Sequence, residues 1–452
     1  MQPTFNAVTL DDWIARAAIP FSVASRERCN AAIDKVSAAL GNAVELLGFG
    51  EALHGGADLL LLRNRLFQRL VEAHGYSAIA IESSFPRSHL VNGYINGHGP
   101  ASYDAVQAHG FSHGFGALAA NRELVEWMRQ YNADPAHQVK LHFYGFDSPT
   151  EMMGSDSPRQ VLQFALAYLA AVDSTSGQAR RERIDALLGP DALWENPAAM
   201  MDPTQSIGLS SAATALRMET EDLISELRVG QPELVAKSDA SRYREALHYA
   251  VVARQLLTYH AAVARPAPNR TADLLGQRDA MMADNLAYIV AQERGRGKVL
   301  AFAHNSHLQR GKAQWQLGPD LLVWWPAGAH LNELFGAHYA VIGTGVGISD
   351  ANGIGQPEAG SLEARLMAAP GPARFLPTYQ GHGLPAADVV ALPLRSGSMK
   401  NSSYFALTPQ SLTDFDWLAF LDSITAASAA ASSTEKEPRD EHFHIGILDR
   451  EA

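Results

Sequence analysis

Two short loops carry the residue types best suited to acid–base chemistry. The first, GEALHG, places Glu51 three residues before His54, and the second, AHNSH, places His304 three residues before His307. Imidazole titrates near neutral pH, so a histidine in such a loop can take a proton from water under working conditions. The glycines around the first loop let the backbone come close to a ligand. Two histidines three residues apart could also bind a metal, and each could instead be structural.

The two loops share a common frame. GFGEALH (48–54) and AFAHNSH (301–307) both read small–Phe–small, then a polar residue, then a histidine three positions later. The alignment matches Glu51 with His304 and His54 with His307, and it suggests an ancient duplication. Each loop follows an apolar run typical of a buried strand. Because the carboxyl ends of parallel strands gather at one edge of a sheet, the frame predicts that these four side chains meet there.

Two further charged residues lie in apolar surroundings. Glu82 ends the run AIAIE, where a carboxylate is costly to bury unless it is paired or functional. Arg63 lies in the run LLLLRNRLF, which favours pairing with a buried carboxylate such as Glu51 or Glu82. Each also has a structural alternative, because Glu82 could stabilise a helix N-terminus and Arg63 could extend to the surface along its apolar stem.

The remaining candidates have weaker signals. His113 lies in the glycine-rich loop HGFSHG and could line a cleft, although an ordinary loop histidine is the favoured interpretation. Arg278, Asp279 and Asn285 follow helical spacing. They could support the site through hydrogen bonds, or they could form a solvated helix face.

The elements that must position these residues alternate along the chain. Apolar runs predict strands at 43–50, 77–83, 140–147, 298–303 and 338–347, with further candidates at 389–394 and 417–421. Helical periodicity predicts helices at 58–74, 87–97, 123–131 and 271–294, with Gly75 as the C-cap of the first. This alternation predicts an α/β fold with a mainly parallel central sheet flanked by helices.

Composition changes along the chain suggest three parts. Residues 40–157 and 266–422 form the predicted α/β catalytic core. Residues 158–265 are rich in Ala, Leu, Arg and Glu and form a predicted helical insertion, which could be a lid, a cleft wall or a plain structural bundle. Residues 423–452 are predicted to be a low-complexity linker and tail.

The bulk composition narrows the class of protein. The chain has 452 residues, a formal net charge of −12 and one cysteine, Cys29. The negative charge argues against nucleic acid as a partner. No run of apolar residues predicts a membrane span or a signal peptide, so we expect a cytoplasmic protein with a small-molecule partner. P-loop, G-x-S-x-G and HExxH motifs are missing, and no cofactor or metal is predicted.

Several motifs in order resemble one known family. GEALHG, Arg63, the IAIES run with Glu82, FYGFD, RDAMMADN and AHNSHL resemble the erythromycin esterase family from about residue 45 to 350, and DWLAFLDS resembles its C-terminal part. The resemblance implies that His54 acts as a general base on water, which attacks a lactone carbonyl without a covalent acyl-enzyme. Glu82 would orient His54.

The remaining roles follow from the same resemblance. Glu51, Arg63 and His304 would shape the site or stabilise the oxyanion, which makes five catalytic residues with His54 and Glu82. His307 would support these residues. Apart from the resemblance, we expect His307, His113 and Arg278 to contact the substrate. The sequence departs from the family in HGFSHGFGALAANRE, where tryptophans are typical and where the substrate cleft would be lined.

Other functions remain open on the sequence. The same residues could activate a substrate hydroxyl, which would make the protein a cyclase, or they could hydrolyse another polyketide-like ester. Two glutamates and three histidines could also hold zinc or manganese in a metal-dependent hydrolase. A non-enzymatic ligand-binding or haem-binding module is the remaining alternative.

Overall fold

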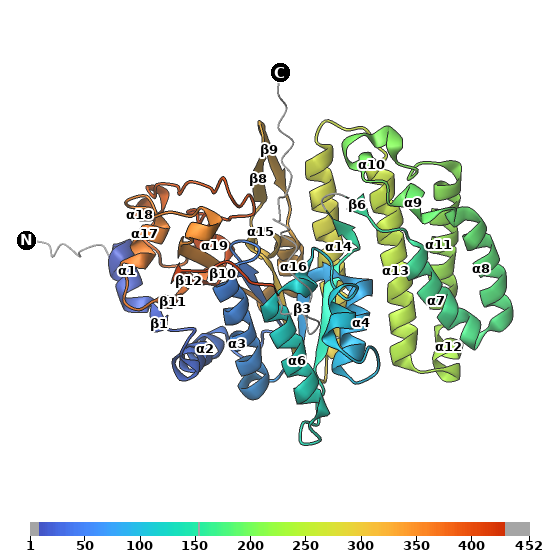
Figure 1. Ribbon diagram of the computed structural model, residues 1–452, viewed down its shortest axis with the longest axis horizontal. Coiled ribbons are helices and arrows are strands. Elements are labelled where there is room, and N and C mark those ends of the chain that lie inside the picture. The colour runs from blue at the N-terminus through green and yellow to red at the C-terminus, as the bar shows by residue number, and fades with distance from the viewer. Residues whose placement is uncertain (1–8, 152–153, 430–452) are drawn as a thin grey trace, which may run out of the picture.

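The computed structural model describes residues 9–151 and 154–429. A central sheet of eight strands runs through it (Figure 1). In order across the sheet, the strands are β1 (Ile19–Phe21), β11 (Ala373–Pro377), β12 (Trp417–Ser423), β10 (Tyr339–Ile348), β2 (Leu46–Glu51), β7 (Lys298–His304), β3 (Tyr76–Ser84) and β4 (His142–Asp147). From β12 to β4 all neighbours are parallel, and β11 runs antiparallel to both of its neighbours, β1 and β12. The predicted α/β fold with a mainly parallel sheet is therefore confirmed.

The two faces of the sheet have different packing, because successive residues of a strand point to opposite sides. One face is covered by α2 (Arg26–Leu40), α3 (Ala57–His74) and α6 (Ala119–Ala133). It carries the large side chains of the central strands, Leu47, Phe49, Ile79, Ile81, Leu300 and Phe302. The other face carries small ones, Ala78, Ala80, Ala301 and Ala303. They leave room for α14 (Arg270–Glu293), which packs against β3, β4 and β7.

The predicted helical segment at 158–265 is helical and has no strand among its described residues. Its main helices are α7 (Arg159–Val172), α8 (Ser174–Leu188), α11 (Ser211–Val229), α12 (Gln231–Lys237) and α13 (Ala240–Val263), with short α9 (Asp191–Trp194) and α10 (Ala198–Met201). They stack beyond α14 as a separate layer (Figure 1). α13 joins this layer to the core by packing against α14.

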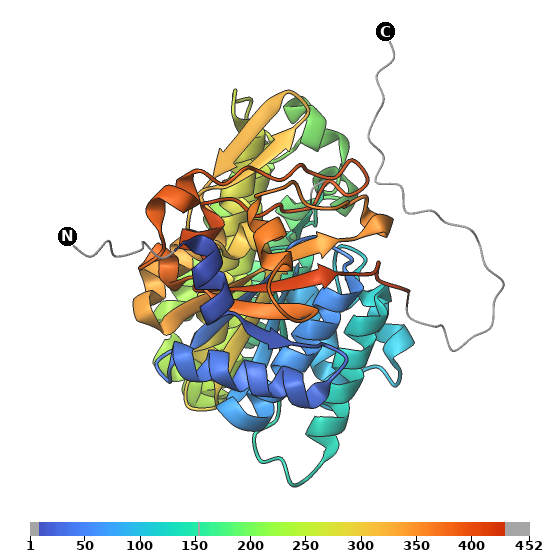
Figure 2. The same ribbon diagram turned by 90° about the vertical axis from the view of Figure 1, so that its left-hand side faces the viewer.

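The N-terminal and C-terminal parts of the core lie together. α1 (Leu10–Ala17) packs against β11 and α17 (Leu362–Met367), and the backbone amide of Leu10 donates to Asp388. Figure 2 shows these first helices beside the last strands.

Among the described residues, no helix combines the length and apolarity needed to cross a bilayer.

Local predictions had mixed outcomes. Gly75 ends α3 in the left-handed conformation, with φ 73°, as predicted. The strand predicted at 389–394 was wrong, because α18 (Ala386–Val390) begins after Pro385 and irregular chain follows it. The prediction also missed β1, β11 and the hairpin β8 (Ala313–Leu317)–β9 (Asp320–Trp324), all of which are only three to five residues long. The tail prediction beyond residue 429 lies outside the described residues.

Candidate active site

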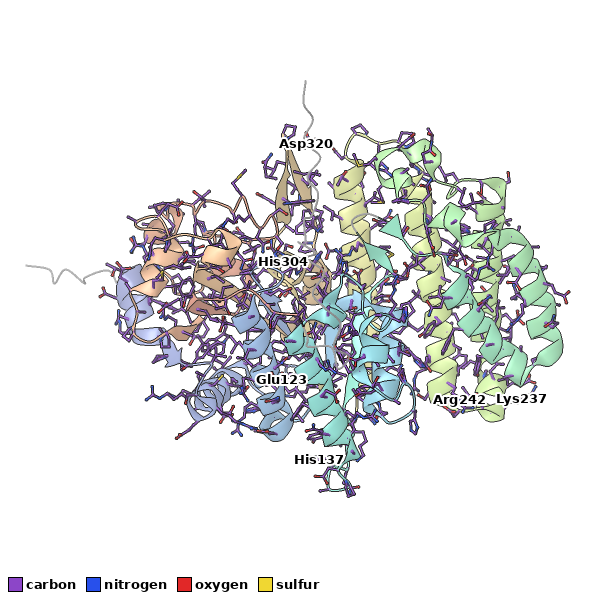
Figure 3. All side chains as sticks on the ribbon, viewed as in Figure 1. Glu123, His137, Lys237, Arg242, His304 and Asp320 are labelled. Carbon is purple, nitrogen blue, oxygen red and sulfur yellow. The ribbon has the colours of Figure 1, made fainter. Side chains whose placement is uncertain are left out.

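The two loops with a common frame lie side by side at the carboxyl edge of the sheet. β2 and β7 are parallel neighbours, and their register pairs Glu51 with His304, the same match that the sequence frame makes. β3 lies on the other side of β7 and carries Glu82, and β4 ends at Asp147. Four strand ends therefore bring polar side chains to one edge. Figure 3 shows His304 near the middle of the molecule, below the β8–β9 hairpin that carries Asp320.

Gly50 allows the Asn305 side chain to pack against the end of β2. A Cβ at this position would collide with Oδ1 of Asn305. That oxygen accepts the backbone N–H of Thr344 at 3.0 Å, and the Asn305 amide donates to the Thr344 carbonyl at 2.8 Å. Asn305 thus ties the end of β7 to β10, across the end of β2.

His54 and Glu51 form a hydrogen-bonded pair. Nδ1 of His54 lies 2.6 Å from Oε1 of Glu51, whose side chain is 3% exposed, whereas that of His54 is 37% exposed. Burial alone would lower the pKa of His54, but the hydrogen bond and charge of Glu51, helped by Glu82, raise it above its ordinary value of 6.5. The carboxylate accepts a hydrogen bond from Nδ1–H, which leaves Nε2 as the nitrogen that can exchange a proton.

His304 is held as a neutral ring. The backbone N–H of Ser306 donates to Nδ1 at 3.2 Å, so Nε2 carries the hydrogen and donates to the Ser403 carbonyl at 2.7 Å. Burial, and then the charge of His54, lower the pKa of His304 to about 3. The ring is therefore uncharged at neutral pH and is a weak base.

His307 has the opposite electrostatic environment. Its Nδ1 lies 2.7 Å from Asp279 and its Nε2 lies 3.3 Å from Glu82. Burial alone would lower the pKa of His307, but these two carboxylates raise it to about 10. His307 is therefore a buried imidazolium at neutral pH.

Glu82 is the centre of the hydrogen-bond network. One oxygen accepts from Arg278 Nη2 at 3.0 Å, and the other accepts the backbone N–H of His304 at 2.9 Å. Burial alone would raise the pKa of Glu82, but the charges of His307, His54 and Arg278 hold it well below its ordinary value. Glu82 was expected to orient His54, and the structure gives that hydrogen bond to Glu51.

Arg278, rather than Arg63, is the arginine that pairs with buried carboxylates. Its guanidinium contacts Asp147 at 2.6 Å and Glu82 at 3.0 Å. Asp147 also lies 3.4 Å from Nε2 of His113, whose backbone is left-handed with φ 56°. Both His307 and Arg278 are under 10% exposed and lie beneath the site surface.

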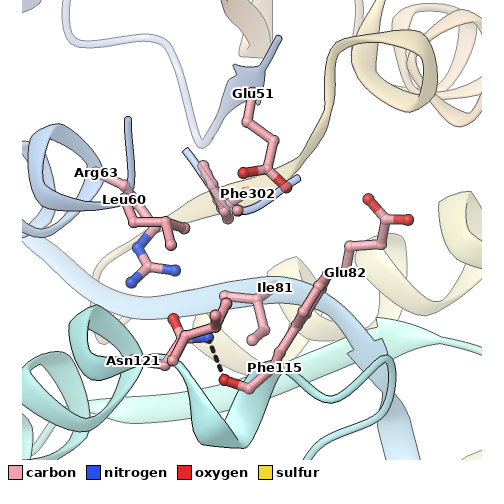
Figure 4. Close-up of a pocket in the computed structure, with 10 residues that line it drawn as sticks. Glu51, Leu60, Arg63, Ile81, Glu82, Phe115, Asn121 and Phe302 are labelled. Carbon is pink, nitrogen blue, oxygen red and sulfur yellow. Dashed lines mark hydrogen bonds between the residues drawn. The ribbon is translucent and has the colours of Figure 1, made fainter. Parts of the chain in front are cut away.

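Arg63 lines a small pocket that Glu51 and Glu82 also line. The guanidinium donates to Oδ1 of Asn64 at 2.7 Å and lies 4.8 Å from the centre of the Phe302 ring. Figure 4 shows the carboxylates of Glu51 and Glu82 on one side of the pocket and Arg63 on the other. Burial lowers the pKa of Arg63 to about 10, so it remains charged at neutral pH. This buried cation thus faces two carboxylates across the pocket.

Three important partners were weakly indicated or missed by sequence reasoning. Asp147 follows an apolar run in the sequence, as Glu82 does, so the same rule could have found it. Asp279 was expected either to support the site through hydrogen bonds or to lie on a solvated helix face, and it binds His307. Ser403 lies in an irregular segment with no sequence signal. Asn285, expected to support the site, donates to the Phe146 carbonyl at 3.0 Å and anchors the end of β4.

A metal centre needs several ligand side chains that converge on one point. Across residues 9–151 and 154–429, no three His, Cys, Asp or Glu side chains converge as a set of metal ligands. In this arrangement both ring nitrogens of His304 and of His307 already have partners within the protein.

Comparisons with known proteins agree with the fold and the motifs. The profile described as erythromycin esterase matches residues 71–424, well over half of the chain. Erythromycin esterase type II of Escherichia coli is 21% identical over 338 residues, which cover 74% of this chain and 76% of that protein.

Solved structures show the same fold at low sequence identity. A Bacillus cereus protein has a TM-score of 0.71 at 19% identity and covers 92% of this chain and 97% of its own. A protein described as a succinoglycan biosynthesis protein has a TM-score of 0.68 at 18% identity, with the same coverage. A mutant erythromycin esterase in its open conformation has a TM-score of 0.61 at 19% identity and covers 88% of this chain and 94% of its own. With the profile match, these findings show that the chain belongs to the erythromycin esterase family.

Proposed function

We propose that this protein is a carboxylic ester hydrolase that opens a lactone or ester by attack of a water that His54 activates. The observation that carries the proposal is the His54–Glu51 pair. Glu51 binds Nδ1 of His54, and Nε2 makes no hydrogen bond with any described residue. A half-exposed imidazole with one nitrogen held by a buried carboxylate is suited to act as a general base.

The reaction needs one proton acceptor. Nε2 of His54 takes a proton from water as the water oxygen attacks the carbonyl carbon, and the carbonyl electrons move onto oxygen. The tetrahedral intermediate collapses, the bond to the alcohol oxygen breaks, and the protonated His54 returns its proton to that oxygen. The products are a carboxylic acid and an alcohol, and a lactone gains the mass of one water.

The other site residues have supporting roles in this proposal. Arg63 is the positively charged side chain in the pocket lining and stabilises the oxyanion. His307 and Arg278 hold Glu82 ionised and in place, and His113 lies at the outer end of the network beside Asp147. The neutral ring of His304 packs against that of His54, with 5.2 Å between ring centroids.

A macrolide-like lactone is the proposed substrate. Support comes from the Escherichia coli relative, which is described as an erythromycin esterase. The test is mass spectrometry of erythromycin incubated with metal-stripped protein, the His54→Ala variant and the control His109→Ala, whose histidine is exposed and outside the pocket. We expect the gain of one water with wild type and with the control, and none with His54→Ala.

Each other outcome contradicts part of the proposal. No product from wild type would rule out this macrolide as substrate, and a panel of simpler esters would then test hydrolysis itself. Activity that returns only with added zinc or manganese would favour a metal-dependent hydrolase. Loss of water from a linear polyketide acid would favour a cyclase.

A further inference from the structure

An irregular segment late in the chain lies over both catalytic loops. This segment, residues 398–405, begins where Ser398 binds the Asn352 carbonyl and ends where the backbone N–H of Phe405 donates to the Ala52 carbonyl at 2.6 Å. It reaches the end of β2 and the end of β7 at the same time. Ser403 makes the contacts to both.

The Ser403 hydroxyl holds the backbone of His54. The backbone N–H of His54 donates to Oγ at 3.0 Å, and Oγ donates to Oδ1 of Asn401 at 2.7 Å. Both hydrogen-bonding roles of the hydroxyl are therefore used. The amide of Asn401 in turn lies 3.4 Å from the His54 carbonyl, so the peptide groups on both sides of His54 are bound.

The Ser403 carbonyl holds the ring of His304. It accepts from Nε2 at 2.7 Å, while the backbone N–H of Ser306 donates to Nδ1. These two contacts specify one tautomer, because Nδ1 must accept and Nε2 must donate. His304 thereby has neither a free lone pair nor a free proton.

We propose that Ser403 is a positioning residue of this site, which holds His54 and His304 in fixed relative places and keeps proton exchange at His54 alone. The part of this inference that concerns kcat and KM rests on the proposed hydrolase function. His307 is excluded from proton exchange by Asp279 and Glu82, and His304 is excluded by Ser306 and Ser403. The groups that face His54 are Glu51, Glu82, His304, His307 and the Phe115 ring.

Three variants test the proposal. Ser403→Ala removes the hydroxyl, Ser403→Thr retains it, and Ser402→Ala is the control, because Ser402 is the exposed neighbour. We expect kcat of Ser403→Ala to fall about tenfold, the size expected for one lost hydrogen bond, with KM changed less than about twofold. Ser403→Thr should recover most of kcat, and Ser402→Ala should match wild type.

A second measurement does not need activity. In protein with ¹⁵N-labelled histidine, the downfield Nε2–H proton of His304, assigned with His304→Gln, should be sharp in wild type and in Ser402→Ala. It should broaden in Ser403→Ala, and the pKa of His54 should change there. Unchanged spectra and kcat in Ser403→Ala would overturn the proposal, as would an equal loss in Ser402→Ala. If wild type hydrolyses no ester, the proposed function fails, and the spectra still decide the role of Ser403.

Discussion

Three histidine rings in this site have three different protonation environments. The ring centroids of His54 and His304 are 5.2 Å apart, and those of His304 and His307 are 6.5 Å apart. At such distances two imidazolium rings repel one another strongly in a buried site. The neutral His304 ring lies between the charged His307 and the titrating His54, which reduces that repulsion. In the proposed mechanism, proton exchange is thereby concentrated on His54, the more exposed ring.

The His54–Glu51 pair predicts the pH dependence of activity. Only neutral His54 can act as a base, so kcat/KM should rise with pH through the His54 pKa, which lies above 6.5. Glu51→Gln removes the charge that raises this pKa, so the midpoint of the rise should move to lower pH. Glu72→Gln, at a surface carboxylate paired with Arg26, is the control. An unmoved midpoint in Glu51→Gln would contradict the pairing.

His307 predicts a pH dependence of stability. Its folded pKa, about 10, lies above the ordinary value of 6.5. The stability that it contributes is therefore fully present below about pH 6.5 and is lost as pH rises through about 10. Urea unfolding at pH 6.5, 8.5 and 10 should show this loss in wild type, and His307→Gln should lack that part of it. Curves of equal pH dependence would show that His307 is not charged in the folded protein.

At the scale of elements, α14 connects the strand ends with the hairpin above them. Arg278 and Asp279 are adjacent on this helix and so point in directions about 100° apart. Arg278 binds the carboxylates of β3 and β4, and Asp279 binds His307. Asp279 also accepts the indole N–H of Trp324 at 2.5 Å and the backbone N–H of Ala327 at 3.1 Å. One helix turn therefore links five other parts of the fold: β3, β4, the His307 loop, β9 and the chain at Ala327.

The hairpin contact predicts a specific loss of stability. Trp324→Phe keeps an aromatic ring and removes the N–H that binds buried Asp279, which should cost about 1–3 kcal/mol of unfolding free energy. Trp325→Phe is a matched control, because Trp325 is 52% exposed. Its loss should be within about 0.5 kcal/mol. Urea denaturation at pH 7 measures both, and equal losses would show that the Trp324 hydrogen bond contributes nothing of its own.

At the scale of the whole molecule, the C-terminal strap, defined as residues 424–429, closes one side of the site. Its backbone bonds to the Gly55 carbonyl at 2.7 Å, to the Ala57 N–H at 2.9 Å and to the Ala119 N–H at 3.1 Å. Gly55 and Leu118 line the pocket at these two places. The strap therefore joins the His54 loop to the start of α6. It lies about 370 positions after the His54 loop along the chain.

Two truncations test the strap. A chain that ends at Ser423 keeps all of β12 but loses the strap. We expect its kcat/KM to fall because the His54 loop loosens. Its Tm should fall by a smaller fraction than kcat/KM. A chain that ends at Ala429 keeps the strap and should retain wild-type activity. Equal activity of the two truncated chains would show that the strap does not position the loop.

The sequence by itself determined the central elements of the core and the meeting of the two histidine-bearing loops. Apolar runs that end in a polar residue predicted β2, β3, β7 and their shared edge, because burial and strand direction are local properties of the chain. The frame that matches Glu51 with His304 predicted their pairing. Short strands such as β8 and β9 were missed, because three to five residues carry too little periodicity.

Only the tertiary structure decided which side chains pair. Arg278 rather than Arg63 binds the buried carboxylates, Glu51 rather than Glu82 binds His54, and Ser403 reaches both histidines from far along the chain. These choices depend on which strands are neighbours and on how α14 and residues 398–405 pack above them. Apart from the Glu51–His54 bond, these contacts join residues 99 to 349 positions apart. A hydrogen bond forms only when both partners are within about 3 Å, so local sequence patterns carry no record of these distant pairs.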